Sequence, residues 1–372
     1  MTTDRRKILF ILHMPPPVHG AAMVGKYIHD SELINSKNEC HYINLTTADS
    51  LEDIGKVGVK KALAFCLLLH KIRQTVKALR PELVYVTANA KGGAFYKDYI
   101  VVEMLKQMGC KVVIHYHNKG VVSRQNRLLD HRLYRRFFKG LKVILLSERL
   151  YSDIQKYVKR ENVYICANGI PQSDGAHDET RKMPDNAPRI LFLSNLLIEK
   201  GILVLLDALR MLKENGTLFY CDVVGGETAE ISATRFEEEI RKRGLQEHVG
   251  YHGKLYGAAK EVYLQRADLF VFPTFYQNEC FPLVLLEAMQ HRLPIITTNE
   301  GGITDIVKDG ENGLICQRNN PEDLSRYLNR LVNDHSLRVR MGQDGYQRYK
   351  THFTLEAFEN RLDEILVLVH SL

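Results

Sequence analysis

The chain has 372 residues, of which 45% are hydrophobic and 26% are charged. This composition excludes disorder, a collagen-like fibre and a disulfide scaffold, and the length favours two domains because single cores stop growing near ~250–300 residues. The net charge of +7 is unevenly divided, with +14 on residues 1–170 and −7 on residues 171–372. We therefore expect the two halves to have different partners.

Short apolar runs alternate with longer amphipathic stretches along the whole chain. Strands of four to six residues separated by helices predict βαβ units with parallel sheets, and two such series predict two doubly wound α/β domains. The predicted strands are 8–13, 41–44, 83–87, 112–116, 143–146, 163–167, 190–194, 219–224, 269–273 and 295–298, with shorter ones near Tyr251 and Ile315. The predicted helices are 20–31, 60–79, 93–108, 127–139, 201–214, 235–243, 283–291, 321–332 and 355–369.

The domain boundary is predicted from turn sequence. Asn168-Gly-Ile-Pro171 is followed by a stretch rich in Ser, Asp, Gly and Pro. We predict an N-terminal domain over 1–168, a linker over 169–188 and a C-terminal domain over 189–351, with the last helix (352–372) packing back on the N-terminal domain. Because parallel sheets bind ligands outside the carboxyl ends of their strands, two facing sheets are expected to enclose a cleft.

The cysteines and the apolar runs indicate the compartment. The seven cysteines are scattered and form no Cys-x-x-Cys pair, which predicts a reducing environment and no structural zinc site. The first apolar run ends in Met14-Pro-Pro-Pro17, unlike a signal peptide, and no uncharged run reaches the ~18 residues of a spanning helix. We therefore expect a cytoplasmic protein.

Two basic segments dominate the first half. Lys56–Arg80 holds seven Lys and Arg, no acid and an apolar run over 62–69, and Arg124–Lys142 places basic residues beside Phe137-Phe138. Such segments predict either binding to an anionic membrane surface, peripheral on its cytoplasmic face, or sheet-packing helices with a solvated basic face. Nucleic acid is not an expected partner because no binding motif is present and the other half is acidic.

Two further motifs of the first half match functional patterns only in part. Gly20-x4-Gly25-Lys26 fits a phosphate-binding loop, but Tyr27 stands where Ser or Thr must hold Mg²⁺, so ATPase activity is not expected. His115 and His117 alternate at the end of a predicted strand and share a face, but no third ligand of suitable spacing accompanies them. We therefore expect no metal site, and a hydrogen-bonded cleft histidine is the simple alternative.

The segment Glu279-Cys-Phe-Pro-Leu-Val-Leu-Leu-Glu287 occupies a strand-to-helix turn. Pro282 suits the first turn of a helix, and the free amides around Phe281–Leu283 would form an anion site suited to phosphate. Glu279 and Glu287 would accept hydrogen bonds from sugar hydroxyls on either side of it. The alternative is a helix with solvated glutamates.

This segment is the E-x7-E arrangement of retaining glycosyltransferases and resembles its family 4 version. The stretches 293–302, 305–314 and 341–353 continue the same pattern, and the resemblance is specific mainly from Leu193 onward. It implies the GT-B fold, two Rossmann-like domains of which the C-terminal one holds a nucleotide sugar. It also implies that Glu287 holds the ribose and that Glu279 contacts the donor sugar.

The resemblance extends to other positions, with two departures. Lys200 would neutralise the leaving diphosphate, but Asn195 stands at the family's Arg position, so Lys254 or Arg149 is a candidate second cation. His117 matches the family histidine near the reacting carbon of the donor. Gly20 would let the backbone approach donor and acceptor, and two candidate acceptor contacts accompany it, Lys119 and His19, which replaces a frequent family Gly.

We therefore predict a metal-independent, retaining hexosyltransferase of cell-surface polysaccharide synthesis. Its donor would be a nucleoside diphosphate sugar, UDP favoured over GDP, and its acceptor a glycan or a lipid-linked sugar. No further cofactor is expected, and the chain has no Asp-x-Asp motif of the kind that holds a divalent metal on a diphosphate. The alternatives are a GT-B sugar-nucleotide epimerase and a non-catalytic nucleotide-sugar-binding subunit, for which Asn195 is the main argument.

Overall fold

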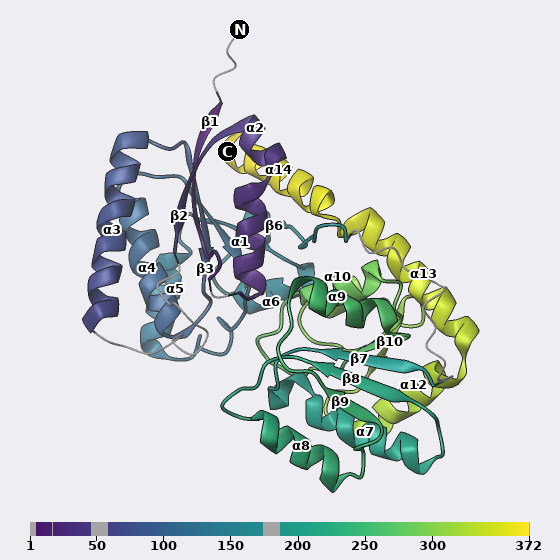
Figure 1. The fold of residues 1–372 in the computed structure, drawn as a ribbon. Helices are drawn as coiled ribbons and strands as arrows, with labels where there is room; N and C mark the ends of the chain where they lie inside the picture. Colours follow the sequence, from purple (N-terminus) through teal and green to yellow (C-terminus); the bar gives the residue numbers. More distant parts are fainter. Residues whose placement is uncertain (1–4, 17, 46–58, 174–186, 372) are drawn as a thin grey trace. The chain divides into compact units, whose positions relative to one another are not determined.

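The computed structural model describes residues 5–16, 18–45, 59–173 and 187–371, without the side chains of 59–61. The chain divides into unit 1, residues 1–168 with 355–372, and unit 2, residues 169–354 (Figure 1). Residues 174–186 of the predicted linker lie outside the described residues.

Unit 1 contains a six-stranded parallel sheet in the order β2-β1-β3-β4-β5-β6. The two strands near its centre, β3 and β4, are buried along their whole length, because helices cover both faces of a doubly wound sheet. The strands are β1 (Arg6–Leu12), β2 (Asn38–Asn44), β3 (Leu83–Ala88), β4 (Val112–Tyr116), β5 (Lys142–Leu145) and β6 (Val163–Ile165).

Right-handed crossovers distribute the helices of unit 1 over the two faces of its sheet. One face carries α3 (Val59–Leu79), α4 (Gly92–Gln107) and α5 (Leu128–Phe137), and the other carries α1 (Gly20–Asp30) and α2 (Glu32–Lys37) (Figure 1). Short helices between β5 and β6 are η2 (Glu148–Leu150), α6 (Tyr151–Ile154) and η3 (Arg160–Asn162).

The last helix, α14 (Leu355–Ser371), is part of unit 1. It buries Phe358, Leu362 and Leu366, and Lys37 of the α2 helix donates to its Asp363 at 2.7 Å. Residues from the end of the sequence therefore complete the core of the unit that contains its beginning.

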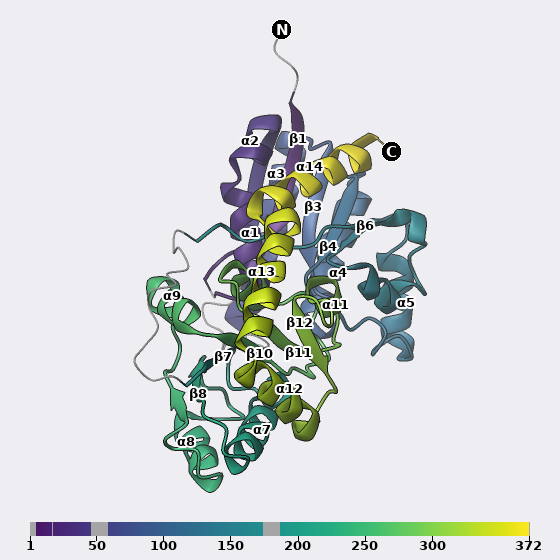
Figure 2. The same ribbon diagram turned by 90° about the vertical axis from the view of Figure 1, so that its right-hand side faces the viewer.

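Unit 2 repeats the doubly wound pattern with the strand order β12-β11-β10-β7-β8-β9, all parallel. The strands are β7 (Arg189–Leu193), β8 (Tyr220–Val224), β9 (Val249–Tyr251), β10 (Leu269–Phe272), β11 (Ile295–Thr298) and β12 (Gly313–Cys316). The helices are η4 (Ile198–Lys200), α7 (Ile202–Glu214), α8 (Ala233–Lys242), α9 (Gly257–Arg266), α10 (Leu283–Gln290), α11 (Ile303–Ile306), α12 (Pro321–Asn333) and α13 (His335–His352). Within this unit α13 packs on α10. The helix α12 packs on α7 (Figure 2).

The predicted class, two Rossmann-like parallel-sheet domains, is confirmed. The Gly20–Lys26 segment forms the first turns of α1 rather than a phosphate-binding loop. A Cβ atom on Gly25 would lie 2.0 Å from the carbonyl oxygen of His13, so this glycine allows α1 to pack against the end of β1.

Candidate active site

The loop between β10 and α10 is held by hydrogen bonds that place Glu279. The Phe275 N–H donates to the carbonyl of Glu199 at 2.8 Å, which ties the loop to η4. The Tyr276 N–H donates to Thr274 Oγ1 at 3.2 Å, and the Glu279 N–H donates to the Tyr276 carbonyl at 2.9 Å. Glu279 and Lys200 are thus brought together from elements that lie about 80 residues apart.

Lys200 and Glu279 form a largely buried ion pair at the carboxyl edge of the unit 2 sheet. Lys200 Nζ donates to Glu279 Oε2 at 2.5 Å, and the two side chains are only 15% and 10% exposed. The ammonium group also lies 4.6 Å from the ring centroid of Tyr276 and 5.3 Å from that of Phe272. Aromatic faces and a carboxylate stabilise a cation at this position in a site with little water.

The turn that delivers Lys200 depends on Gly201. This residue has φ +84°, and a Cβ atom on it would lie 2.1 Å from the carbonyl oxygen of Pro273. Only glycine combines the left-handed conformation with so close an approach to the end of β10. The backbone therefore requires glycine directly after Lys200.

Glu287 lies inside α10, eight residues after Glu279. Its Oε1 accepts from Lys260 Nζ of α9 at 2.7 Å, while Oε2 is buried and has no partner among the residues that the structure describes. Sequence reasoning missed Lys260, because no spacing links it to the motif. One oxygen of Glu287 is thus fixed by a cation, and the other has no partner among the described residues.

The helix α10 begins at Leu283, as predicted, but Pro282 lies one position before its first turn. Pro282, predicted in the first turn, is the N-cap residue with φ −68° and ψ 120°, so the helix begins at Leu283. No side chain of the described part of the chain caps this end, and Phe281 is buried against the ring of Phe353 at 5.8 Å between centroids. The amides of the first turn are consistent with an anion site.

Asn195, at the position of the expected arginine, has a structural partner. Its Oδ1 accepts a hydrogen bond from the Gly226 N–H at 3.1 Å, which joins the loops after β7 and β8. A Cβ atom on Gly226 would lie 3.2 Å from Asn195 Oδ1 and 3.3 Å from Lys254 Cδ, so Lys254 lies beside Asn195. The other candidate cation, Arg149, belongs to unit 1.

In unit 1, His115 and His117 lie at the end of β4, with ring centroids 4.2 Å apart. The Tyr85 hydroxyl and His115 Nδ1 are hydrogen-bonded at 2.5 Å. Both ring nitrogens of His117 are buried and have no partner among the described residues. Burial, followed by the influence of His13 and His19, lowers the pKa of His117 to about 3, so the ring is neutral at physiological pH.

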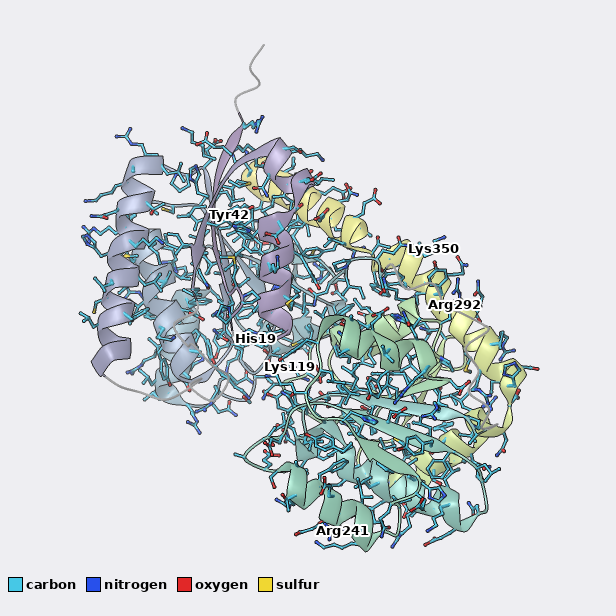
Figure 3. The ribbon with its side chains drawn as sticks, in the orientation of Figure 1. His19, Tyr42, Lys119, Arg241, Arg292 and Lys350 are labelled. Atoms are coloured by element: carbon cyan, nitrogen blue, oxygen red, sulfur yellow. The ribbon has the colours of Figure 1, made fainter. Side chains whose placement is uncertain are left out.

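The two candidate acceptor residues follow β1 and β4 at the same edge of the unit 1 sheet. His19, labelled in Figure 3, is the N-cap of α1. Its Nδ1 accepts from the Ala22 N–H at 3.3 Å. Next to it, a Cβ atom on Gly20 would have no described atom within 4 Å, which leaves space for a ligand. Lys119, also labelled in Figure 3, precedes a loop whose Gly120 N–H donates to the carboxylate of Asp153 at 2.8 Å.

Most of the sequence of unit 2 matches a family of known proteins. Residues 175–348, which include the Lys200–Glu279 pair and Glu287, match the family described as glycosyl transferases group 1. The match covers slightly less than half of the chain.

Curated relatives and solved structures cover more of the chain. O-antigen chain mannosyltransferase C of Escherichia coli is 27% identical over 255 residues, 66% of each protein. Sucrose-phosphate synthase of Thermosynechococcus elongatus superposes with a TM-score of 0.76 at 19% identity, covering 99% of this chain and 100% of that one. Anabaena Alr3699/HepE in complex with UDP gives 0.73 at 18% identity, covering 97% and 99%, and other structures of it hold UDP with glucose or UDP-glucose.

These comparisons establish the GT-B fold for this chain. The chain spans 66% and 53% of the first two curated relatives that it matches. Within the described residues, no helix combines the length and apolar character needed to cross a membrane, and no group of three His, Cys, Asp or Glu side chains could hold a metal ion.

Proposed function

We propose that the protein transfers a hexosyl unit from a nucleoside diphosphate sugar, UDP favoured over GDP, to a glycan or lipid-linked acceptor with retention of configuration. The observation that carries the proposal is the buried Lys200–Glu279 pair next to the uncapped start of α10. The UDP-glucose complex of a structural neighbour and the name of the O-antigen mannosyltransferase relative support the donor class and a role in cell-surface polysaccharide synthesis.

In this proposal, unit 2 holds the donor nucleotide. Lys200 and the amides around Phe281–Leu283 bind the diphosphate, and Lys200 offsets the charge that grows on the phosphate as it departs. Glu279 uses Oε2 to hold Lys200 and offers Oε1 to the sugar hydroxyls, while Oε2 of Glu287 binds the ribose. Lys254, beside Asn195, is the second cation.

The bond changes need no side-chain base. The bond from the anomeric carbon to the diphosphate breaks, the bond to the acceptor oxygen forms on the same face of the sugar, and the acceptor proton moves to the departing phosphate. His117 is a poor base because its pKa is lowered to about 3, so we assign it hydrogen bonding to the donor sugar. Neither this chemistry nor the residues used require a metal ion or a further cofactor.

A panel of UDP- and GDP-sugars tests this function. We expect one sugar nucleotide to raise the melting temperature, slow nucleotide release without acceptor, and a product whose anomeric configuration by NMR matches the donor. An epimerase would instead convert the sugar nucleotide alone, and a binding subunit would show the thermal shift without turnover. Absence of binding by every sugar nucleotide would contradict the proposal.

We also propose that unit 1 binds the cytoplasmic face of an anionic membrane. Leu63 and Leu67 of α3 are each 63% exposed and precede the exposed Lys71 and Arg73. Lys56 and the side chains of Lys60 and Lys61 lie outside the described residues.

The second basic segment, Arg124–Lys142, does not expose the phenylalanines that the sequence places beside its basic residues. Phe137 and Phe138 are buried in the core of unit 1 and cannot insert into lipid, whereas Leu128 and Leu129 at the start of α5 are 67% and 62% exposed. The exposed apolar side chains of the Arg124–Lys142 segment therefore lie at the N-terminal end of α5, ahead of its exposed arginines.

Liposome flotation tests the membrane proposal. Lys71→Gln with Arg73→Gln should reduce flotation with anionic vesicles, because each basic residue near such a surface contributes about 1 kcal/mol. Arg241→Gln with Arg340→Gln removes the same charge from exposed positions of unit 2 and is the matched control. Equal flotation of the two double variants would refute this surface.

A further inference from the structure

A group of imidazoles lies at the carboxyl edge of the unit 1 sheet, and the proposed reaction uses only part of it. His13 directly follows β1 and His117 directly follows β4, so both lie where parallel strands present ligand contacts. The rings of His13 and His19 have centroids 6.5 Å apart, and the influence of His13 contributes to the lowered pKa of His117. His13 has no role in the reaction described above.

A chain of amide hydrogen bonds fixes which nitrogen of His13 carries the proton. The Ala90 N–H donates to Asn118 Oδ1 at 2.8 Å, which makes the other terminal atom of Asn118 the nitrogen. Asn118 Nδ2 donates to Asn89 Oδ1 at 2.9 Å, and Asn89 Nδ2 donates to His13 Nε2 at 3.2 Å. Because Nε2 accepts this bond, the neutral His13 ring carries its proton on Nδ1.

Asp98 anchors this network beneath the ring. Its Oδ2 accepts from the Asn89 N–H at 2.7 Å and from Asn89 Nδ2 at 2.9 Å, and its side chain is buried. Asn89 therefore has both amide hydrogens and its carbonyl oxygen engaged, and cannot rotate without losing several bonds at once. The orientation of the His13 ring is built into the loops after β1, β3 and β4.

The chemistry of the two rings selects the kind of ligand. Burial is the main cause that lowers the pKa of His13 to about 4 and that of His117 to about 3, so both are neutral at physiological pH. Neutral imidazoles give no charge to attract a phosphate. The unpaired nitrogens of His117 need one donor and one acceptor, and a hydroxyl group supplies either.

We propose that His13 and His117 together bind neighbouring hydroxyl groups of a sugar, with His13 donating through Nδ1–H and Asn89 holding its ring. The inference rests on the proposed transfer reaction, because that reaction supplies the sugar. A donor sugar and an acceptor sugar share this hydroxyl chemistry, and binding measurements separate the two.

Calorimetry compares UDP with the UDP-sugar that the wild type uses, in wild type, His13→Phe and His13→Asn. If the site binds the donor sugar, His13→Phe should bind the UDP-sugar about tenfold more weakly than the wild type does and should bind UDP equally well. If it reads the acceptor, the acceptor KM rises by about the same factor instead. His13→Asn keeps a donor nitrogen near the position of Nδ1 and stays within about threefold of wild type. His29→Phe, on the far end of α1, is the matched control.

The tautomer provides a readout that needs no turnover and that the wild type alone can give. In the ¹⁵N-histidine spectrum of the wild type, one neutral ring should be protonated on Nδ1, and Asn89→Leu should shift its signals. A wild type that binds no sugar nucleotide contradicts the proposed function itself. Wild-type binding with unchanged donor affinity and acceptor KM in His13→Phe, or a His13 ring protonated on Nε2, overturns the His13 subsite.

Discussion

Replacing Lys200 with Met removes a cation from a buried pair and keeps an apolar stem of similar length. The partner carboxylate of Glu279 is 10% exposed and 2.5 Å from the ammonium group that would be lost. Breaking a buried ion pair by removing one partner typically costs ~3–5 kcal/mol, because the remaining charge stays desolvated. We expect Lys200→Met to lower the free energy of unfolding of unit 2 by about 3 kcal/mol.

The double variant Lys200→Met with Glu279→Gln separates stability from chemistry. Without either charge, the site buries a neutral amide, and we expect the stability to return to within about 1 kcal/mol of wild type. Turnover should not return, because the cation that offsets the leaving diphosphate is still missing, and a loss of roughly 10²- to 10³-fold in kcat is expected in both variants.

Urea-dependent hydrogen exchange of α10 peptides measures the stability of the unit that holds the pair, and the rate of nucleotide release measures turnover. Lys242→Met, at a side chain that is 64% exposed, is the control and should change stability by no more than about 0.5 kcal/mol. A cost of less than about 1 kcal/mol for Lys200→Met, or recovery of activity in the double variant, would refute the reasoning.

Three further predictions concern single residues. Burial raises the pKa of Asp98 from 3.8 to about 6, so the folded state binds more protons than the unfolded state between these pH values, and stability falls as pH rises through this range. Asp98→Asn should therefore gain up to about 3 kcal/mol of unfolding free energy above pH 6 and little near pH 3.8. Equal gains in urea unfolding at both pH values would contradict this. The pKa of His117 is lowered from 6.5 to about 3, so stability falls as pH drops below 6.5. At about pH 5 the wild type should have lost about 2 kcal/mol of unfolding free energy that His117→Asn does not lose. Parallel pH profiles of the two proteins would contradict this. Gly201→Ala places a Cβ atom 2.1 Å from the Pro273 carbonyl oxygen, on a residue in the left-handed conformation. It should destabilise unit 2 by at least about 2 kcal/mol, measured by hydrogen exchange of α7. A near-neutral result would show that the turn can relax.

The alternation of strands and helices was predictable because apolar runs of four to six residues are buried on both faces of a parallel sheet. Strand order was not, since a run such as β10 is equally apolar whichever strand it pairs with. The helix α9 was missed for a related reason: of its ten residues only Leu264 is buried, so the apolar periodicity that indicates a helix is absent. Ion pairs such as Lys260–Glu287 hold it instead.

Some residues of the candidate site could be predicted from local sequence, and others could not. Glu279, Glu287 and Lys200 were predicted because the motif fixes their spacing and the backbone requires glycine after Lys200. Lys260 and Asn89 come from elements that only the sheet order brings to the site, so no local pattern identifies them. From the sequence, Asn195 was interpreted as the loss of a positive charge. In the structure its side-chain carbonyl oxygen accepts a hydrogen bond from Gly226 and so joins two loops, a bond that an arginine could not make.

The place of α14 has a consequence for synthesis on the ribosome. Unit 2, residues 169–354, is translated completely before α14 exists, whereas unit 1 lacks Phe358, Leu362 and Leu366 of its core until α14 emerges. The unit that is translated first is therefore the one that finishes folding last. A nascent chain stalled before Leu355 would carry a complete unit 2 and an open unit 1, with the apolar face that α14 covers exposed to chaperones.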